Sequence, residues 1–400
     1  MSKIQVKAFF KICRVKVMNQ TVDLANNTVM IEVEPDKRYV PVCSSCKQHT
    51  QGIHSYKQRV IRERDIFGAK TFISVIYRTV QCFRCGHVVE DTGLMEPSKR
   101  VTKRLANYIL DLCKIMTIKD VAKHLDLDWK TVKDIHKNHL IDVFSRADVC
   151  IPRILVVDEI SIRKGHQYLT IIADWDSGRV LWTGEGRKYE TLKGFFDSLS
   201  DKQRSSIEAV AMDMWDPYIK AVHEGCPHAK IVFDQFHVVA AFGRVINKVR
   251  NAEYKKAHKS EKEVMKGSKY ILLKNRDNLS EQEKPRLKAI LKLNESLTIV
   301  YILKDYLKKL WRYKYTKCAE NALEHWCALA YESGIKSVIS FAKTLRRYAY
   351  GIINHCRFPI HTSRMEGINN KIKVIKRKAY GFHDMEYFSL VIKSAFAHTN

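Results

Sequence analysis

The order of strand-like and helical segments after residue 153 constrains the fold of this chain most strongly. Short apolar runs of strand length recur there between polar and turn residues, which is typical of buried strands. The runs, in chain order, span residues 153–160, 167–175, 179–186, 207–215 and 229–238. A segment with helical spacing, 189–199, separates the third run from the fourth, and no strand-like run follows residue 242. The pattern predicts an α/β domain joined to an all-helical region.

Acidic residues end the first and fourth of these runs. Asp158 follows Ile-Leu-Val-Val, and Asp213 follows the run from Ala209 to Met212, so we expect each at the carboxyl end of a buried strand. Three strands, a helix and a fourth strand fit an RNase H-like sheet, in which the first and fourth strands are neighbours. The two carboxylates would then lie together. Oxygen ligands suit Mg²⁺, and two such ions about 3.5–4 Å apart catalyse phosphodiester transfer.

A third carboxylate, Glu366, lies in a segment of helical spacing at 364–378. Its apolar face carries Ile368, Ile372 and Ile375. The opposite face carries Glu366 and three residues that we expect to contact DNA: Asn370, Lys373 and Arg377. Taken singly, each acid is more simply a solvated or capping carboxylate. Together, the placement of Asp158, Asp213 and Glu366 favours one catalytic metal site.

Other residues near these acids have weaker signals. Asp234 and His237 form a D-x-x-H motif at the end of the fifth strand, where they could tune the metal site, contact DNA or form a structural pair. Trp215 could stack on a base or belong to the core, just before a helix that Asp216 would cap and Pro217 would open. Three further acids are assigned elsewhere: Glu159 to the opposite sheet face, Asp174 to the second strand and Asp176 to a turn with Ser177 and Gly178.

Two Cys-x-x-Cys pairs precede the α/β region. Cys43 and Cys46 are separated by 35 residues from Cys82 and Cys85, and strand-like segments flank both pairs. Four thiolates in two tight knuckles suit one tetrahedral, structural Zn²⁺, and Gly86 suits the positive φ of a closing knuckle. A redox pair is the alternative for either motif alone. His49 and His87 are substitute ligands or, more simply, surface residues. The other cysteines are expected to be small buried residues: Cys13, Cys113, Cys150, Cys226, Cys318, Cys327 and Cys356.

A helix-turn-helix pattern lies between the cysteine pairs and the strands. Residues 118–125 form one predicted helix, and Asp128 is a plausible N-cap for a second helix over 129–140. In the second helix, Val132, Ile135 and His139 are expected to face inward. Its outward face would carry the DNA-contacting residues Lys130, Thr131, Lys133 and Lys137, together with Asp134. An ordinary helical hairpin is the alternative.

The charge of the chain indicates its partner. Among 400 residues there are 70 Lys and Arg against 43 Asp and Glu, a net charge of +27, and a polyanion such as nucleic acid is the expected ligand. No run of about 18 apolar residues is present, which excludes a transmembrane helix, and the N-terminal segment lacks the apolar core of a secretory signal. Eleven cysteines, with two tight pairs, indicate a reducing compartment. We therefore expect a cytoplasmic, nucleoid-associated protein.

In order along the chain, these motifs resemble the ISL3 family of insertion-sequence transposases. The most specific part is Arg-Met-Glu-Gly-Ile-Asn-Asn-Lys from residue 364, with the segments around Asp158, Asp213 and Asp234 and the cysteine pairs in the expected order. The resemblance implies a DDE triad of Asp158, Asp213 and Glu366. It also implies that 243–356 is an insertion before the glutamate, which accounts for the 152 residues between Asp213 and Glu366.

The expected architecture is multidomain α/β, with an RNase H-like core that carries an all-α insertion. The expected domains are 1–97 (β-rich, zinc-binding), 98–148 (helix-turn-helix), 149–242 (first part of the core), 243–356 (insertion) and 357–400 (second part of the core). The predicted function is that of a DDE transposase. Through two Mg²⁺ or Mn²⁺ ions, it would cleave at the terminal inverted repeats of its element and join the 3′-OH to target double-stranded DNA, as a homodimer or larger oligomer. The alternatives are an RNase H-like nuclease or resolvase without strand transfer, and a catalytically dead zinc-dependent DNA-binding regulator.

Overall fold

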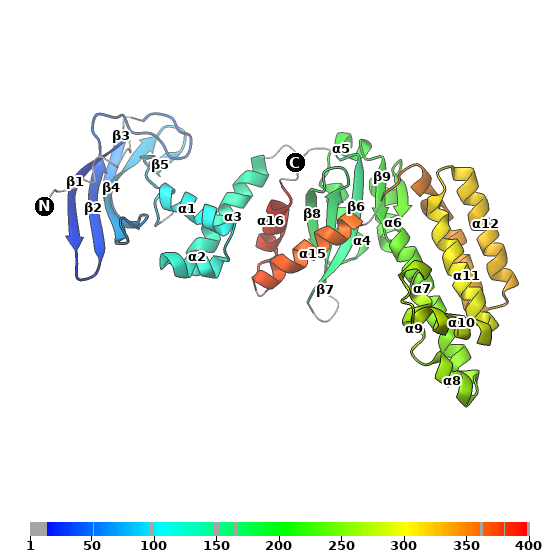
Figure 1. Cartoon of the computed structure of the whole chain (residues 1–400). Helices are drawn as coiled ribbons and strands as arrows, with labels where there is room; N and C mark the ends of the chain where they lie inside the picture. The colour runs from blue at the N-terminus through cyan, green and yellow to red at the C-terminus, as the bar shows by residue number, and fades with distance from the viewer. Residues whose placement is uncertain are drawn as a thin grey trace. The chain divides into compact units, whose positions relative to one another are not determined.

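The computed structural model describes residues 14–50, 52–95, 100–146, 152–163, 167–360, 363–379 and 381–397. The chain divides into two compact units, residues 1–146 and 147–400. Figure 1 shows a β-sheet and a group of helices in the first unit, and a second sheet with many helices in the other. Within the described residues, no helix is both long and apolar enough to cross a membrane.

The first unit begins with a five-stranded sheet. Its strands are β1 (Val15–Asp23), β2 (Thr28–Pro35), β3 (Gly52–Arg62), β4 (Lys70–Cys82) and β5 (Gly86–Val89). The order is β1-β2-β4-β3, and β5 pairs with β4. The alternation of apolar and polar residues around Asn26 and Asn27 predicts a turn there, and the structure confirms it between β1 and β2, with Asn27 at a φ of 47°. Strand β3 is missing from the sequence prediction because most of its side chains, apolar ones included, are exposed, so no apolar alternation marks it.

Three helices complete this unit: α1 (Lys103–Cys113), α2 (Ile118–Leu125) and α3 (Trp129–Arg146). Their buried side chains, among them Ile109, Val121 and Val132, form one small core. The predicted cap of α3 is confirmed, since Asp128 Oδ1 accepts from the backbone N–H of Lys130 at 2.9 Å. Helix α3 runs six residues beyond its expected end.

The predicted inward position of His139 on α3 is wrong. His139 is exposed, whereas Leu140 is buried and continues the stripe begun by Val132 and Ile135. One turn earlier, His136 is half-buried instead, and burial lowers its pKa to about 4. Seven residues from Val132 do return to nearly the same helix face, so helical spacing alone predicts an inward His139. The residues removed from solvent instead follow four-residue steps, from Val132 through His136 to Leu140.

The second unit contains another five-stranded sheet. Its strands are β6 (Ile154–Arg163), β7 (Gln167–Asp174), β8 (Val180–Glu185), β9 (Ala209–Met212) and β10 (Lys230–Phe233). The order is β10-β9-β6-β7-β8, with β6, β7 and β8 antiparallel and β9 parallel to both β6 and β10. The expected contact between the first and fourth strands of this domain is therefore confirmed.

Helices cover both faces of this sheet (Figure 1). The face that carries Leu155 and Val157 packs against α4 (Tyr189–Asp197) and α6 (Asp216–Gly225). The face that carries Ile154 and Val156 packs against α15 (Ser363–Lys378) and α16 (Met385–Ala395). The short helix α5 (Asp201–Ser205) follows α4. The predicted cap of α6 is wrong by one residue, because Trp215 occupies the N-cap position and Asp216 is the first helical residue.

The stretch between β10 and α15 is helical, and among its described residues no strand occurs, as expected. Helix α7 begins at Gln235, eight residues before the boundary expected at 243. Its elements are α7 (Gln235–Lys256), α8 (Lys259–Met265), α9 (Lys269–Leu273), α10 (Glu283–Leu293), α11 (Glu295–Lys309), α12 (Thr316–Glu332), α13 (Lys336–Arg347) and α14 (Ala349–Ile353), with 3-10 turns η2 (Arg276–Asn278), η3 (Leu310–Arg312) and η4 (Asn354–Cys356). Buried residues of α7, α11, α12 and α13 share the core of α4 and α6.

The cysteines outside the two pairs follow the prediction only in part. Cys226 and Cys327 are buried as expected, and Cys113 and Cys356 are half-buried. Cys318 is exposed, which contradicts the expectation, because it lies in the first turn of α12 beside the buried Ala319 rather than on the buried face. Cys13 and Cys150 lie outside the described residues.

Candidate active site and metal centre

Asp158 lies in the middle of β6, not at its end. The pairing of β6 with β9 stops at Val156 and Ala211, but β6 continues to Arg163 beside β7. The expected strand end is therefore wrong for β6 as a whole, although Asp158 does lie just beyond its pairing with β9. Asp158 Oδ1 accepts from the backbone N–H of Glu159 at 2.7 Å. Burial raises the pKa of Asp158, and the nearby charge of Asp213 raises it further.

Asp213 directly follows β9 and contacts the D-x-x-H motif. The distance between Asp213 Oδ2 and His237 Nδ1 is 2.7 Å, and His237 Nε2 lies 3.7 Å from Asp234 Oδ2. One ligand atom from each of the three lies within 4.8 Å of the others, a grouping that can hold a metal ion. Burial opposes protonation of His237, but the Asp213 carboxylate outweighs it and raises the pKa.

Asp234 has a structural role as well. It occupies the N-cap position of α7, and its Oδ1 accepts from the backbone N–H of Phe236 at 2.8 Å. A carboxylate at this position is favourable because it satisfies a free N–H and the positive end of the helix dipole. The cap fixes the start of α7, and His237 lies in its first turn beside Asp213. The structural interpretation of the motif and the active-site interpretation are therefore compatible.

Glu366 lies in the first turn of α15, on the same sheet face as Asp158, with its side chain exposed. Arg364 anchors this end of the helix, since its guanidinium donates to the backbone oxygens of Trp175 and Asp176 at the turn between β7 and β8. The predicted turn there is confirmed, with Gly178 at a φ of +73°. The structure does not bring Glu366 into a group of three ligands with Asp158 and Asp213: no such group of described residues includes it.

Asn369 is the residue of α15 that reaches Asp158. Its Nδ2 donates to Asp158 Oδ2 at 2.6 Å, while its Oδ1 is buried without a hydrogen-bond partner among the described residues. An unpaired buried carbonyl oxygen is costly, unless a further donor or a cation satisfies it. Sequence reasoning missed Asn369. The available signal was its spacing, since it lies three residues after Glu366 and hence on nearly the same helix face.

The apolar face of α15 is as predicted. Ile368 and Ile372 are buried and Ile375 is half-buried against the sheet and α16. The residues expected to contact DNA are exposed on the other side: Asn370, Lys373 and Arg377. Basic side chains thus lie along the exposed face of the helix that carries Glu366.

Glu159 points to the opposite face of the sheet from Asp158, as predicted. It shares that face with Tyr218 of α6, whose hydroxyl oxygen lies 2.6 Å from Thr170 Oγ1. Burial raises the pKa of Glu159 to about 7, and the charges of Asp213 and Asp158 contribute to the rise. The two faces of β6 therefore each present a carboxylate, and Asp213 lies close to both.

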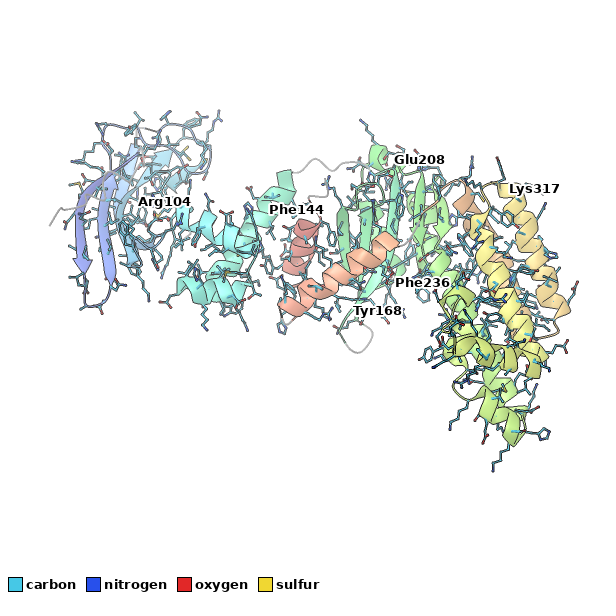
Figure 2. The ribbon with its side chains drawn as sticks, viewed as in Figure 1. Arg104, Phe144, Tyr168, Glu208, Phe236 and Lys317 are labelled. Atoms are coloured by element: carbon cyan, nitrogen blue, oxygen red, sulfur yellow. The ribbon has the colours of Figure 1, made fainter. Side chains whose placement is uncertain are left out.

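Trp215 is at the surface, which excludes the interpretation that it belongs to the core. Its side chain is 39% exposed, and its indole Nε1–H donates to the backbone oxygen of Arg187 at 3.1 Å. The Arg187 guanidinium lies over the Trp215 ring and also over that of Tyr168, which Figure 2 labels at the start of β7. Sequence reasoning missed Arg187, because nothing in a single arginine after a strand marks it.

The four paired cysteines meet in the first unit. Their sulfur atoms all lie within 4.8 Å of one another, and the distance between the Cys46 and Cys82 Sγ atoms is 3.6 Å. Bonds of about 2.3 Å from sulfur to a tetrahedral Zn²⁺ place the sulfurs about 3.8 Å apart, so this set fits such an ion. Gly86 has the predicted positive φ, 73°. The histidines considered as substitute ligands, His49 and His87, are exposed and outside the cluster.

The environment of the cluster favours thiolate at Cys43. Burial opposes ionisation of this thiol, but hydrogen bonds from the backbone N–H groups of Cys46 and Ser45 outweigh it and lower the pKa to about 7. Backbone N–H groups that point at a sulfur are a regular feature of metal-binding knuckles because they stabilise its negative charge.

The helix-turn-helix presents fewer exposed residues than predicted. On α3, Lys130 and Asp134 are exposed. The other residues that were predicted to face outward are partly covered: Thr131, Lys133 and Lys137. Lys130 also lies over the ring of Trp129, with its Nζ 6.0 Å from the centroid. Of the four residues of α3 predicted to contact DNA, Lys130 in the N-terminal turn is therefore the exposed one.

Comparisons with known proteins agree with this arrangement. Residues 155–392 match a family model described as "Transposase", and residues 90–140 match the helix-turn-helix domain of transposase family ISL3. The chain is 38% identical over 373 residues, 92% of both chains, to the transposase of insertion sequence element IS1001 of Bordetella parapertussis. It is 28% identical over 286 residues to the transposase of IS1557 of Mycobacterium tuberculosis, covering 66% of this chain and 64% of the relative.

Proposed function

The chain belongs to the ISL3 family of insertion-sequence transposases, and on that premise we propose that it is a DDE transposase acting on the ends of its own element. It would bind the terminal inverted repeats, cleave a phosphodiester bond at each end and join the resulting 3′-OH to target DNA. The observation that carries this proposal is the position of Asp158 and Asp213, which come from neighbouring parallel strands and interact electrostatically.

The strand order supports an RNase H-like catalytic core. Three antiparallel strands, followed by two parallel strands with the fourth beside the first, are the arrangement expected of that fold. Helices on both faces leave the carboxyl end of β9 as the place where Asp213, Asp158 and the start of α7 come together. The all-helical stretch between β10 and α15 would be the insertion that separates Asp213 from Glu366.

Asp158, Asp213 and Glu366 would hold two Mg²⁺ or Mn²⁺ ions. The donor set fits hard cations, because it offers carboxylate oxygens and the unpaired Oδ1 of Asn369. When bound, such ions lower the energy of the phosphodiester transition state by neutralising charge on its oxygens. Glu366 would contribute from the first turn of α15, which Arg364 holds against the sheet.

The chain's own groups would keep these carboxylates in place. His237 bonds to Asp213 and Asn369 to Asp158, so each acid has a partner that orients one of its oxygens. Partners of metal ligands are important for activity because they set ligand orientation. The exposed basic side chains of α15, Lys373 and Arg377, would contact phosphates beside the cleaved bond, and Asn370 would contact the same strand.

The first unit would recognise the element ends. One structural Zn²⁺ on the cysteine cluster would fix the loops of the small sheet, and α3 would enter the major groove. The groups proposed to contact DNA there are Lys130, Thr131, Lys133 and Lys137. Residues 251–320 of the insertion carry 18 Lys and Arg against 9 Asp and Glu, which would add phosphate contacts. Because two ends must be held together, we expect a dimer or larger assembly on DNA.

A cleavage assay on DNA that carries the element's own end tests this proposal. The wild-type chain should cut at the end only with Mg²⁺ or Mn²⁺ present. Asp158→Asn should bind the same DNA with unchanged affinity and cut at least about 1,000-fold more slowly. Cleavage that survives this substitution would refute the metal assignment. A wild-type chain that binds the end without cutting it would favour the alternative of a catalytically dead DNA-binding regulator.

A further inference from the structure

An arginine lies between two aromatic rings next to the candidate active site. The guanidinium carbon of Arg187 is 4.3 Å from the ring centroid of Tyr168 and 5.2 Å from that of Trp215. The hydrogen bond from Trp215 Nε1 to the Arg187 backbone oxygen fixes the indole relative to the same residue. We refer to these three residues as the aromatic stack.

The aromatic stack is tied to the catalytic centre by the backbone. Tyr168 lies at the start of β7, Arg187 follows β8, and Trp215 precedes α6. The backbone N–H of Trp215 donates to the backbone oxygen of Asp213 at 2.8 Å. A group bound on the exposed indole would therefore lie within a few ångströms of the chain segment that carries Asp213.

The aromatic stack has the exposure and charge of a binding surface. The Trp215 side chain is 39% exposed, so part of its indole surface is available to a ligand. Within the described part of the chain, Arg187 forms no ion pair with a carboxylate within 4 Å, and its charge acts on Glu159 only at longer range. A bound anion would be a closer partner for this guanidinium. The ring and the cation together match a nucleotide, which has both a flat apolar face and a phosphate.

Resting on the proposed function, we propose that the aromatic stack binds an unpaired nucleotide of the DNA end beside the cleaved bond, with the base on Trp215 and a phosphate at Arg187. An intact duplex does not offer the face of a base, because neighbouring base pairs cover it. An unpaired nucleotide does, and stacking on an indole accepts any base. The element end would thus be locally opened where it enters the active site.

Fluorescence of 2-aminopurine tests this proposal, because stacking on an indole quenches it. The probes are a single-stranded oligonucleotide of about 12 thymidines with one central 2-aminopurine, and an element end carrying 2-aminopurine beside the expected cut. Full-length wild-type protein should bind and quench both without added Mg²⁺. Trp215→Ala and Arg187→Gln should bind the single strand about 5- to 100-fold more weakly, and Trp215→Phe should retain most of the affinity.

Tyr39→Ala is the matched control, since Tyr39 is also 39% exposed and has an arginine, Arg14, over its ring at 5.7 Å, and neither residue is among those proposed to contact DNA. It should bind and quench like the wild type. If Trp215→Ala and Arg187→Gln do so too, with melting temperatures unchanged, the proposal is overturned. If only Trp215→Ala has a lowered melting temperature, Arg187→Gln and Trp215→Phe replace it in the test. The proposal is then overturned if Arg187→Gln binds and quenches like the wild type, or if Trp215→Phe loses most of the affinity. Because the readout is binding, a chain that fails to cleave DNA would leave this test intact.

Discussion

Asn369 determines how the Asp158 carboxylate is oriented. Its amide joins α15 to β6 through a single 2.6 Å hydrogen bond, and its carbonyl oxygen is left unpaired in a buried position. This contact could not be predicted from the sequence. Helical spacing does place Asn369 near the face of Glu366, but which of the two reaches β6 depends on how α15 is rotated against the sheet. That rotation is set by the packing of Ile368 and Ile372.

We predict that Asn369→Ala slows DNA-end cleavage by about 10- to 100-fold, the range found when a partner of a metal ligand is removed. The Mg²⁺ concentration for half-maximal rate should rise as well, because Asp158 loses the group that orients it. Cleavage rates at several Mg²⁺ concentrations give both values. Val374→Ala is the control, because Val374 lies on the same helix, is exposed and is not among the residues proposed to contact metal or DNA. Equal rates for the Asn369 variant and wild type would show that the contact has no role.

That Asp158 and Asp213 lie close together could be predicted from short segments of sequence. Each follows an apolar run, and the fourth strand of the predicted order pairs with the first, so the two acids fall at the same edge. For Glu366, the sequence predicted only the face of the helix on which it lies. The sequence does not give the distance between Glu366 and the two aspartates. That distance depends on how α15 packs on the sheet, and more than a hundred residues of the expected insertion separate the two in the chain.

At the scale of elements, the cysteine cluster joins two loops that are distant in sequence. The first knuckle precedes β3, and the second connects β4 to β5. The spacing predicted this cluster, although β3 between the pairs was missed because its exposed side chains do not alternate. In the same way, the start of α6 was misjudged by one residue, because Asp216 and Pro217 suit the first turn as well as the cap.

We predict that Cys43→Ser with Cys46→Ser removes one zinc per chain and weakens binding to the element end. Loss of a structural metal unfolds a small domain that depends on it. Metal analysis of the purified protein measures the first effect, and a DNA-binding titration the second. Cys113→Ser with Cys318→Ser serves as a control with the same number of thiols removed. An unchanged zinc content in the first variant would contradict the assignment of the cluster.

The insertion contains a buried lysine whose charge is costly. Lys304 on α11 is only 2% exposed, and its amino group donates to the backbone oxygens of Leu272 and Lys274 at 2.8 and 2.7 Å. Burial lowers the pKa of Lys304 to about 8. The unfolded chain has the ordinary lysine pKa of about 10.4, so it binds more protons than the folded chain between these values. The folded state therefore gains stability from this group as pH rises from about 8 to 10.4.

We predict that this gain is absent in Lys304→Met. The difference in unfolding free energy, wild type minus variant, should increase by about 2 kcal/mol between pH 7.5 and pH 9.5. Denaturant unfolding at the two pH values measures it, and other titrating groups cancel in the difference. Lys309→Met, a change on the same helix at a surface position, should show no such increase. A constant difference for Lys304→Met would mean that burial does not shift this group.

At the scale of the whole molecule, the excess of basic residues is distributed over several parts of the chain. The helix-turn-helix, the insertion and α15 each contribute basic side chains, and the family model for transposases matches residues 155–392, which include the last two. The composition alone predicted a nucleic-acid partner. The reaction was predictable only from the three acids and the order of motifs, because net charge attracts DNA without specifying any chemistry.

The central claim is that one site containing Asp158, Asp213 and Glu366 joins a free DNA end to a target. The most direct measurement supplies a pre-cut element end with a 3′-OH and a supercoiled target plasmid, and detects the joined product on a gel. The wild-type chain should give Mg²⁺-dependent joining, while Asp158→Asn and Glu366→Gln should bind the end and give no product. Cleavage of uncut ends without joining of pre-cut ones, or joining by Asp158→Asn, would contradict the account.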